Sequence, residues 1–116
     1  MPELSDEVRY KLLKLLETEP AFSQRQLAER LGISVGKANY CLRALVQKGF
    51  VKVRNFRSSQ NKQTYSYLLT PKGIEEKAKV TVRFLQFKIR EFEALRSEIE
   101  RLRMDENAVN ESRSAR

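Results

Sequence analysis

The sequence predicts a mainly α-helical fold with one small β-hairpin, followed by a long C-terminal helix. Three observations lead to this prediction. Three apolar stripes of helical period precede Gly49, and strand-forming residues gather in the stretch after it. No proline or glycine interrupts the chain after Gly73, which allows a helix far longer than a chain of 116 residues needs for its core. This chain length suits one compact domain with one protruding element.

Local signals delimit the first two helices. Ser5 precedes an apolar stripe that ends before Pro20, so we expect the first helix between these two residues. Ser23 and Gln26 have the spacing of a capping box, which starts a second helix. Gly32 is suited to the left-handed conformation that ends a helix, so the second helix has only about two turns.

A third helix follows Ser34, a suitable N-cap, and ends at Gly49. Its apolar residues share one face, which we expect to be buried: Ala38, Cys41, Leu42, Leu45 and Val46. The opposite face points outward. A short helix, a turn at Gly32 and a second helix with an outward face have the spacing of a helix-turn-helix, whose second helix enters the DNA major groove.

The segments 50–56 and 64–69 are rich in strand-forming residues and flank a polar stretch, so they predict a β-hairpin. A hairpin after three helices is a wing, which we place at residues 54–63. Pro71 is suited to the first position of a fourth helix, which can extend to Arg103. The predicted fold is therefore a winged helix-turn-helix followed by a long helix. We divide the chain into a DNA-binding domain (1–72), a C-terminal dimerisation helix (73–103) and a disordered tail (104–116).

The charge of the chain indicates a polyanionic partner. Its formal net charge is +8 and its sequence pI is about 9.9. From Arg30 to Ile74 there are nine basic residues and no acidic residue. This one-sided composition suits a surface that binds phosphate groups, whereas a solvated basic surface that only keeps the protein soluble is the alternative.

Several classes of function are disfavoured by composition. The chain has no histidine and one cysteine, Cys41, so we expect no disulfide, no metal site, no cofactor and no enzymatic activity. Cys41 lies on the apolar face of the third helix, which indicates inert core, with a redox-sensing thiol as the alternative. No apolar run approaches ~20 residues, and the N-terminus lacks the features of a signal peptide. We therefore expect a cytoplasmic protein without a membrane partner.

The helix 34–48 carries the residues that we expect to contact duplex DNA. Its outward residues are Ser34, Val35, Gly36, Lys37, Asn39, Tyr40 and Arg43. Gly36 would allow the helix backbone to approach the DNA closely. Asn39 can read adenine, whereas Lys37 and Arg43 can read guanine or bind phosphate. Tyr40 suits a phosphate contact and a half-buried position at the edge of the core equally well.

Basic residues also surround the predicted tip of the hairpin. Arg54, Arg57 and Lys62 can reach backbone phosphates or a narrow minor groove from this position. The alternative is that these charges prevent edge-to-edge pairing of an exposed hairpin, a common use of lysine and arginine.

The long helix carries a heptad pattern that predicts a homodimer. The residues that we expect in the interface are Leu85, Ile89, Phe92, Leu95, Ile99 and Leu102. Glu91 and Glu98 fall at g positions, and Arg96 and Arg103 fall at the following e positions, which suits a parallel coil, although antiparallel packing stays open. A single helix with intrachain charge pairs is the alternative. A two-fold dimer would place two recognition helices about 34 Å apart, so the operator should be an inverted repeat.

The sequence resembles the MarR family of winged-helix bacterial regulators. The resemblance rests on Phe22-Ser-Gln-Arg-Gln-Leu-Ala-Glu-Arg-Leu-Gly32, Lys37-Ala-Asn-Tyr-Cys-Leu-Arg-Ala-Leu45, Lys48-Gly-Phe-Val51 and Leu69-Thr-Pro-Lys-Gly73. The run 36–45, followed by Val53-Arg-Asn-Phe-Arg57, is similar to the compact subgroup associated with exopolysaccharide biosynthesis loci. The resemblance implies DNA binding by helix 34–48 and the wing, homodimerisation through terminal helices and, often, repression relieved by a small ligand.

The chain departs from the family pattern in two places. It lacks the N-terminal helix that precedes the domain in larger members, which leaves the usual dimer and its ligand cleft open. Residues 57–62 replace the Asp-x-Arg element of many members, which leaves the wing contact open. A winged-helix module that binds proteins rather than DNA is the competing hypothesis. The absence of acidic residues from 30–74 favours the DNA-binding hypothesis, because a protein-binding module does not require a surface free of negative charge.

Overall fold

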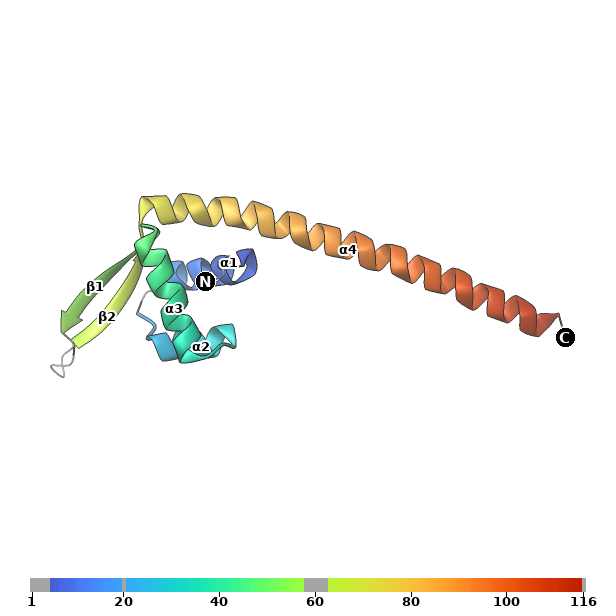
Figure 1. Cartoon of the computed structure of the whole chain (residues 1–116), viewed down its shortest axis with the longest axis horizontal. Helices are drawn as coiled ribbons and strands as arrows, with labels where there is room; N and C mark the ends of the chain where they lie inside the picture. The colour runs from blue at the N-terminus through green and yellow to red at the C-terminus, as the bar shows by residue number, and fades with distance from the viewer. Residues whose placement is uncertain (1–4, 20, 58–62, 116) are drawn as a thin grey trace. The chain divides into compact units, whose positions relative to one another are not determined.

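The computed structural model describes residues 5–19, 21–57 and 63–115, with the side chains of 55–57, 63 and 64 excepted (Figure 1). The elements are α1 (Asp6–Thr18), α2 (Gln24–Leu31), α3 (Val35–Gln47), β1 (Val51–Arg57), β2 (Gln63–Leu69) and α4 (Pro71–Ser114). The chain divides into two units, Met1–Phe84 and Leu85–Arg116. The predicted fold class, mainly helical with one antiparallel hairpin, is confirmed.

Side-chain caps begin the first three helices where the sequence predicted them. The hydroxyls of Ser5 and Ser34 each accept a hydrogen bond from the backbone three residues further on, at 3.2 and 3.1 Å. Ser23 and Gln26 make both bonds of a capping box, at 3.2 and 2.8 Å. Gly32 ends α2 with a φ of 69°, a conformation that costs glycine little. Gly32 and the Ser34 cap together set the turn between α2 and α3.

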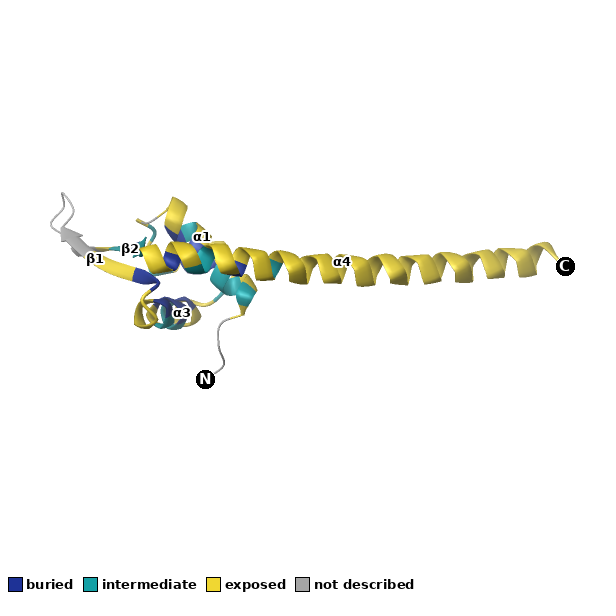
Figure 2. Ribbon diagram, turned by 90° about the horizontal axis from the view of Figure 1, so that it is seen from above, coloured by how far each residue is buried: buried dark blue, intermediate teal, exposed yellow. Residues whose placement is uncertain are grey.

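The core of the first unit lies where the three helices meet the base of the hairpin. Figure 2 shows its buried residues in dark blue. Its largest fully buried side chains in the helices before the hairpin are Leu12, Leu13, Leu16, Leu27, Leu42 and Leu45. Val46 is 37% exposed, so the prediction that it is buried was wrong. The reason is its position toward the hairpin, where it lines an open cavity together with Leu42 and Val53.

The hairpin has one face toward the helices and one face away from them. Val53 pairs with Tyr67 in the antiparallel register. Val51 and Tyr67 are buried on the inner face, at 2% and 6% exposure. Because side chains alternate along a strand, Lys52 and Arg54 lie on the outer face. The hairpin is therefore anchored at its base by apolar contacts and carries cations on its other side.

The beginning of α4 belongs to the first unit and is bound to α1. Val80 is completely buried. Glu76 accepts a hydrogen bond from Arg9 at 3.2 Å, in a pair that is only 14% and 11% exposed. Arg83 bridges Asp6 and Glu76 at 3.2 and 3.3 Å. These ion pairs join residues far apart in sequence and set the position of this part of α4 on α1.

The second unit consists of the continuation of α4. The helix ends at Ser114, so the predicted end at Arg103 and the predicted disorder of 104–116 were wrong for the described residues up to Ser114. The reason is local: this segment lacks proline and glycine, and Met104, Glu106 and Ala108 favour helix. In the described part of the chain, no helix combines the length and the hydropathy needed to cross a bilayer.

Candidate nucleic-acid interface

The first turn of α3 is the most exposed part of the predicted DNA surface. Ser34, Val35, Gly36 and Lys37 are all exposed, as predicted for outward residues. Ser34 also holds the turn in place, because its hydroxyl caps the helix. A Cβ added to Gly36 would meet only the Ser34 hydroxyl oxygen, at 4.0 Å. Gly36 therefore has open space around it, and nothing in the free protein requires a glycine there.

The next residues of α3 differ in how they are held. Arg43 is exposed and forms no ion pair with any described residue. Tyr40 is half-buried and packs against the core, which agrees with the core-edge interpretation of this residue. Asn39 is also half-buried, and its side-chain oxygen accepts a hydrogen bond from Gln24 Nε2 at 3.2 Å. A contact between Asn39 and adenine remains a prediction.

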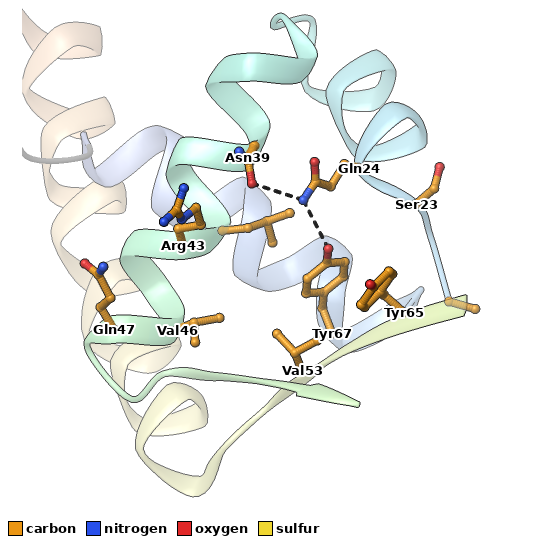
Figure 3. A pocket seen from close by; sticks show the side chains of 11 residues that line it. Ser23, Gln24, Asn39, Arg43, Val46, Gln47, Val53, Tyr65 and Tyr67 are labelled. Carbon is orange, nitrogen blue, oxygen red and sulfur yellow. Dashed lines mark hydrogen bonds between the residues drawn. The ribbon is translucent and has the colours of Figure 1, made fainter. Parts of the chain in front are cut away.

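A cavity of about 700 Å³ opens between the start of α2, one side of α3 and the inner face of the hairpin (Figure 3). Its apolar wall includes Leu42, Val46, Val53, Tyr65 and Tyr67. Its polar rim includes Ser23, Gln24, Asn39, Arg43 and Gln47. None of the residues that line it is acidic. The cavity thus adjoins two of the predicted DNA contacts, Asn39 and Arg43.

The hairpin residues predicted to contact DNA are only partly described. Arg54 is exposed on the outer face of β1, away from the cavity. The backbone of Arg57 pairs with Gln63, whereas its side chain and the whole of Lys62 lie outside the described residues. The predicted contacts of Arg57 and Lys62 therefore remain predictions.

The described basic side chains of residues 30–74 have no acidic partner among the described residues. Among the described residues, every ion pair lies outside this stretch, and most join α1 to α4 or link residues one turn apart. Lys72 does have intramolecular partners, because its amine donates to the Lys48 carbonyl at 3.1 Å and lies over the Phe50 ring. Neither partner carries a negative charge, so the surface as a whole retains its attraction for phosphate.

Cys41 lies in the core beside these surface residues. Its side chain is 0% exposed. Burial raises the pKa of the Cys41 thiol, and the positive charge of Lys37 opposes this shift only in part. The thiol is therefore neutral and shielded near pH 7, as the interpretation of Cys41 as core requires. The described residues also contain no cluster of acidic or cysteine side chains that could hold a metal ion.

Comparison with known families identifies the first unit. Residues 5–52, from the cap of α1 to the start of β1, match a family model described as winged helix-turn-helix DNA-binding. The first unit is a winged helix. The comparison with curated proteins gives no match. The closer resemblance to the exopolysaccharide-associated subgroup therefore remains a prediction.

Three solved structures resemble this winged helix: two are transcription regulators and the third is a protein in complex with DNA. A PadR-like regulator from Bacillus cereus has a TM-score of 0.67 and 16% identity, over 76% of this chain and 90% of that one. PcaV from Streptomyces coelicolor, in complex with its natural ligand, has a TM-score of 0.57 and 23% identity, over 69% of this chain and 55% of that one. FabT from Streptococcus pneumoniae, in complex with DNA, has a TM-score of 0.53 and 20% identity, over 78% of this chain and 60% of that one. The chain spans less than two thirds of PcaV and FabT.

Three residues that line the cavity were not predicted from the sequence: Gln24, Tyr65 and Tyr67. Tyr65 and Tyr67 alternate along β2, so the period of two could have placed them on the inner face. Gln24 had no comparable signal, because its two hydrogen-bond partners lie 15 and 43 residues away.

Proposed function

We propose that this chain is a transcription regulator that binds specific duplex DNA as a homodimer. In this proposal α3 lies in the major groove and the hairpin contacts the backbone or the minor groove. The observation that carries the proposal is the exposed start of α3 in a stretch of 45 residues without an acid, mounted on a winged helix. The DNA complex of FabT supports it, because that protein has a similar fold.

The roles of the surface residues follow from their exposure and chemistry. Lys37 and Arg43 are exposed cations without an acidic partner among the described residues, so they are available for guanine or phosphate. The open space at Gly36 leaves the helix backbone accessible to a sugar or a phosphate. Arg54, on the outer face of β1, would contact the backbone beside the hairpin. Such a regulator acts without a cofactor, in the compartment that contains the DNA.

The second copy is proposed to bind along the second unit. Between Leu85 and Leu102, large apolar side chains are 41–61% exposed: Leu85, Ile89, Phe92, Leu95, Ile99 and Leu102. All of these residues except Ile89 occupy a or d positions of a heptad, which matches the seam of a two-stranded coil. Ile89 lies beside the d position that Lys88 fills. The helix beyond Arg103 adds Val109 at the next d position, seven residues after Leu102. An apolar stripe of this length on a single helix is exposed to solvent unless another helix covers it.

The experiment that tests the proposal is selection of bound sequences from a random duplex library, followed by fluorescence anisotropy on the selected duplex. We expect an inverted repeat and a logarithm of affinity that falls linearly with the logarithm of salt concentration, with a slope that reflects several phosphate contacts. A scrambled duplex of equal composition serves as the control. Equal affinity for both duplexes, or an affinity independent of salt, would contradict the proposal and favour a protein-binding module.

A further inference from the structure

Gln24 connects three elements of the winged helix through one side-chain amide. It is the first residue of α2, and its Nε2 donates to the Asn39 side-chain oxygen on α3 and to the Tyr67 hydroxyl on β2, each at 3.2 Å (Figure 3). An amide nitrogen carries two protons, so both are used. Tyr67 is only 6% exposed and belongs to the core, which makes it a rigid anchor for Gln24.

This arrangement couples the orientation of the Asn39 amide to that of the Gln24 amide. A free asparagine can present either its oxygen or its nitrogen by a half turn of the amide. In this structure the oxygen is turned toward Gln24 and the nitrogen is turned away from it (Figure 3). With the Gln24 nitrogen directed toward Asn39 as it is here, a reversed Asn39 amide would place two NH₂ groups against each other and leave both without an acceptor there. The opposite polarity requires both amides to turn together and the Tyr67 hydroxyl to become the donor.

We propose that Gln24 is a positioning residue that makes Asn39 a hydrogen-bond donor toward DNA and thereby sets base preference at one position. This inference rests on the proposed function. In the major groove, purine N7, guanine O6 and thymine O4 are acceptors, whereas cytosine offers only its amine donor. Asn39 held in this way selects against cytosine. It also disfavours the bidentate adenine contact, which needs the Asn39 oxygen as well as the nitrogen at the base edge.

A single substitution should reverse this polarity. In Gln24→Glu, the carboxylate is an acceptor of nearly the same shape. The Tyr67 hydroxyl, which accepts from Gln24, can instead donate to the carboxylate. The Asn39 amide then gains a hydrogen bond to this carboxylate by turning its nitrogen toward position 24 and its oxygen outward. Every partner in the network keeps a hydrogen bond, so the fold has no reason to change while the group offered to DNA is inverted.

The test is selection from a random duplex library with the full-length protein, its Gln24→Glu variant and a Gln26→Glu control. The control adds the same charge to the same helix, and its carboxylate can still accept the Ser23 amide bond of the capping box. We expect Gln24→Glu to shift preference at one base pair of each half-site about two- to tenfold toward bases with amine donors, the size of one hydrogen bond. Gln26→Glu should weaken binding to all sequences without changing their order.

A neutral variant, Gln24→Met, covers the case in which Gln24→Glu binds DNA too weakly to be profiled. It frees the Asn39 amide, so we expect broader preference at the same base pair and unchanged affinity for random DNA. An unchanged base profile in either Gln24 variant would overturn the positioning role. Absence of sequence preference in the wild-type protein is a separate result, which overturns the proposed function and this inference with it.

Discussion

Two glycines on either side of the hairpin have opposite surroundings. A Cβ built on Gly73 would lie 2.0 Å from the Phe50 carbonyl oxygen, whereas one built on Gly36 meets nothing closer than 4.0 Å. The first glycine is required by the close approach of α4 to the backbone that precedes β1. The second is compatible with a side chain in the free protein, so any need for it must come from a partner.

The variant Gly73→Ala should therefore destabilise the fold. The added methyl group must displace backbone, and forced overpacking of this kind costs about 1–3 kcal/mol. Urea unfolding followed by circular dichroism measures the loss, with Gly36→Ala as the matched control at an open site. Equal stability of both variants would show that α4 does not pack this closely against Phe50.

The variant Gly36→Ala should keep its stability or gain slightly, because alanine is favoured over glycine in helices by about 0.5–1 kcal/mol. Its affinity for the selected duplex should fall about 5- to 30-fold, corresponding to one or two kcal/mol, because the methyl group occupies the space left for DNA. Anisotropy titrations measure this loss. Undiminished affinity would mean that the α3 backbone does not approach the duplex at Gly36.

Cys41 should react slowly in the folded protein. Its raised pKa keeps the thiol protonated at pH 7–8, and the thiolate is the species that attacks an alkylating reagent. We expect iodoacetamide labelling to be slow in buffer and fast in denaturing urea, as measured by mass spectrometry on this chain with a single cysteine. Fast labelling of the native protein would instead support a redox-sensing thiol.

At the level of elements, the features that could be predicted from the sequence are those that depend on interactions between residues close together in the chain. The caps at Ser5, Ser23 and Ser34 bond to backbone within three residues, so their effects can be deduced from spacing alone. The exposure of Val46 could not be deduced this way, because it depends on where the hairpin diverges from α3. The bonds of Gln24 could not be deduced either, because they require the packing of three elements.

The contrast between α3 and α1 provides a test of which helix contacts DNA. Arg43→Ala should cost about 1–3 kcal/mol on the selected duplex and less on random DNA, as loss of a base contact does. Lys11→Ala, which removes an exposed cation paired with Glu7 on α1, should have little effect. If Arg43→Ala loses the same binding free energy on both duplexes, Arg43 contacts a phosphate rather than a base. If Arg43→Ala and Lys11→Ala lose the same binding free energy, α3 is not the helix that contacts DNA.

At the level of the whole molecule, the oligomeric state should depend on the apolar stripe of the second unit. Phe92→Glu places a charge at an a position, so we expect the dimer to dissociate to a monomer with an unchanged winged helix. Ser97→Glu, at the outward f position of the same heptad, is the control and should remain dimeric. Light scattering after size-exclusion chromatography distinguishes the two. A monomeric wild-type protein, or a dimeric Phe92→Glu variant, would contradict the proposed interface.

If the chain is the regulator proposed above, the exposure of this stripe has a consequence for gene control. All described side chains from Leu85 to Ala115 are exposed, so in the proposed dimer the partner helix would supply the burial that this unit lacks. If free subunits must pair before they can occupy a two-fold operator, occupancy at low abundance rises with the square of subunit concentration. A twofold dilution at cell division would then lower occupancy about fourfold in that regime. The apolar stripe would thus make repression or activation a threshold response to the amount of regulator.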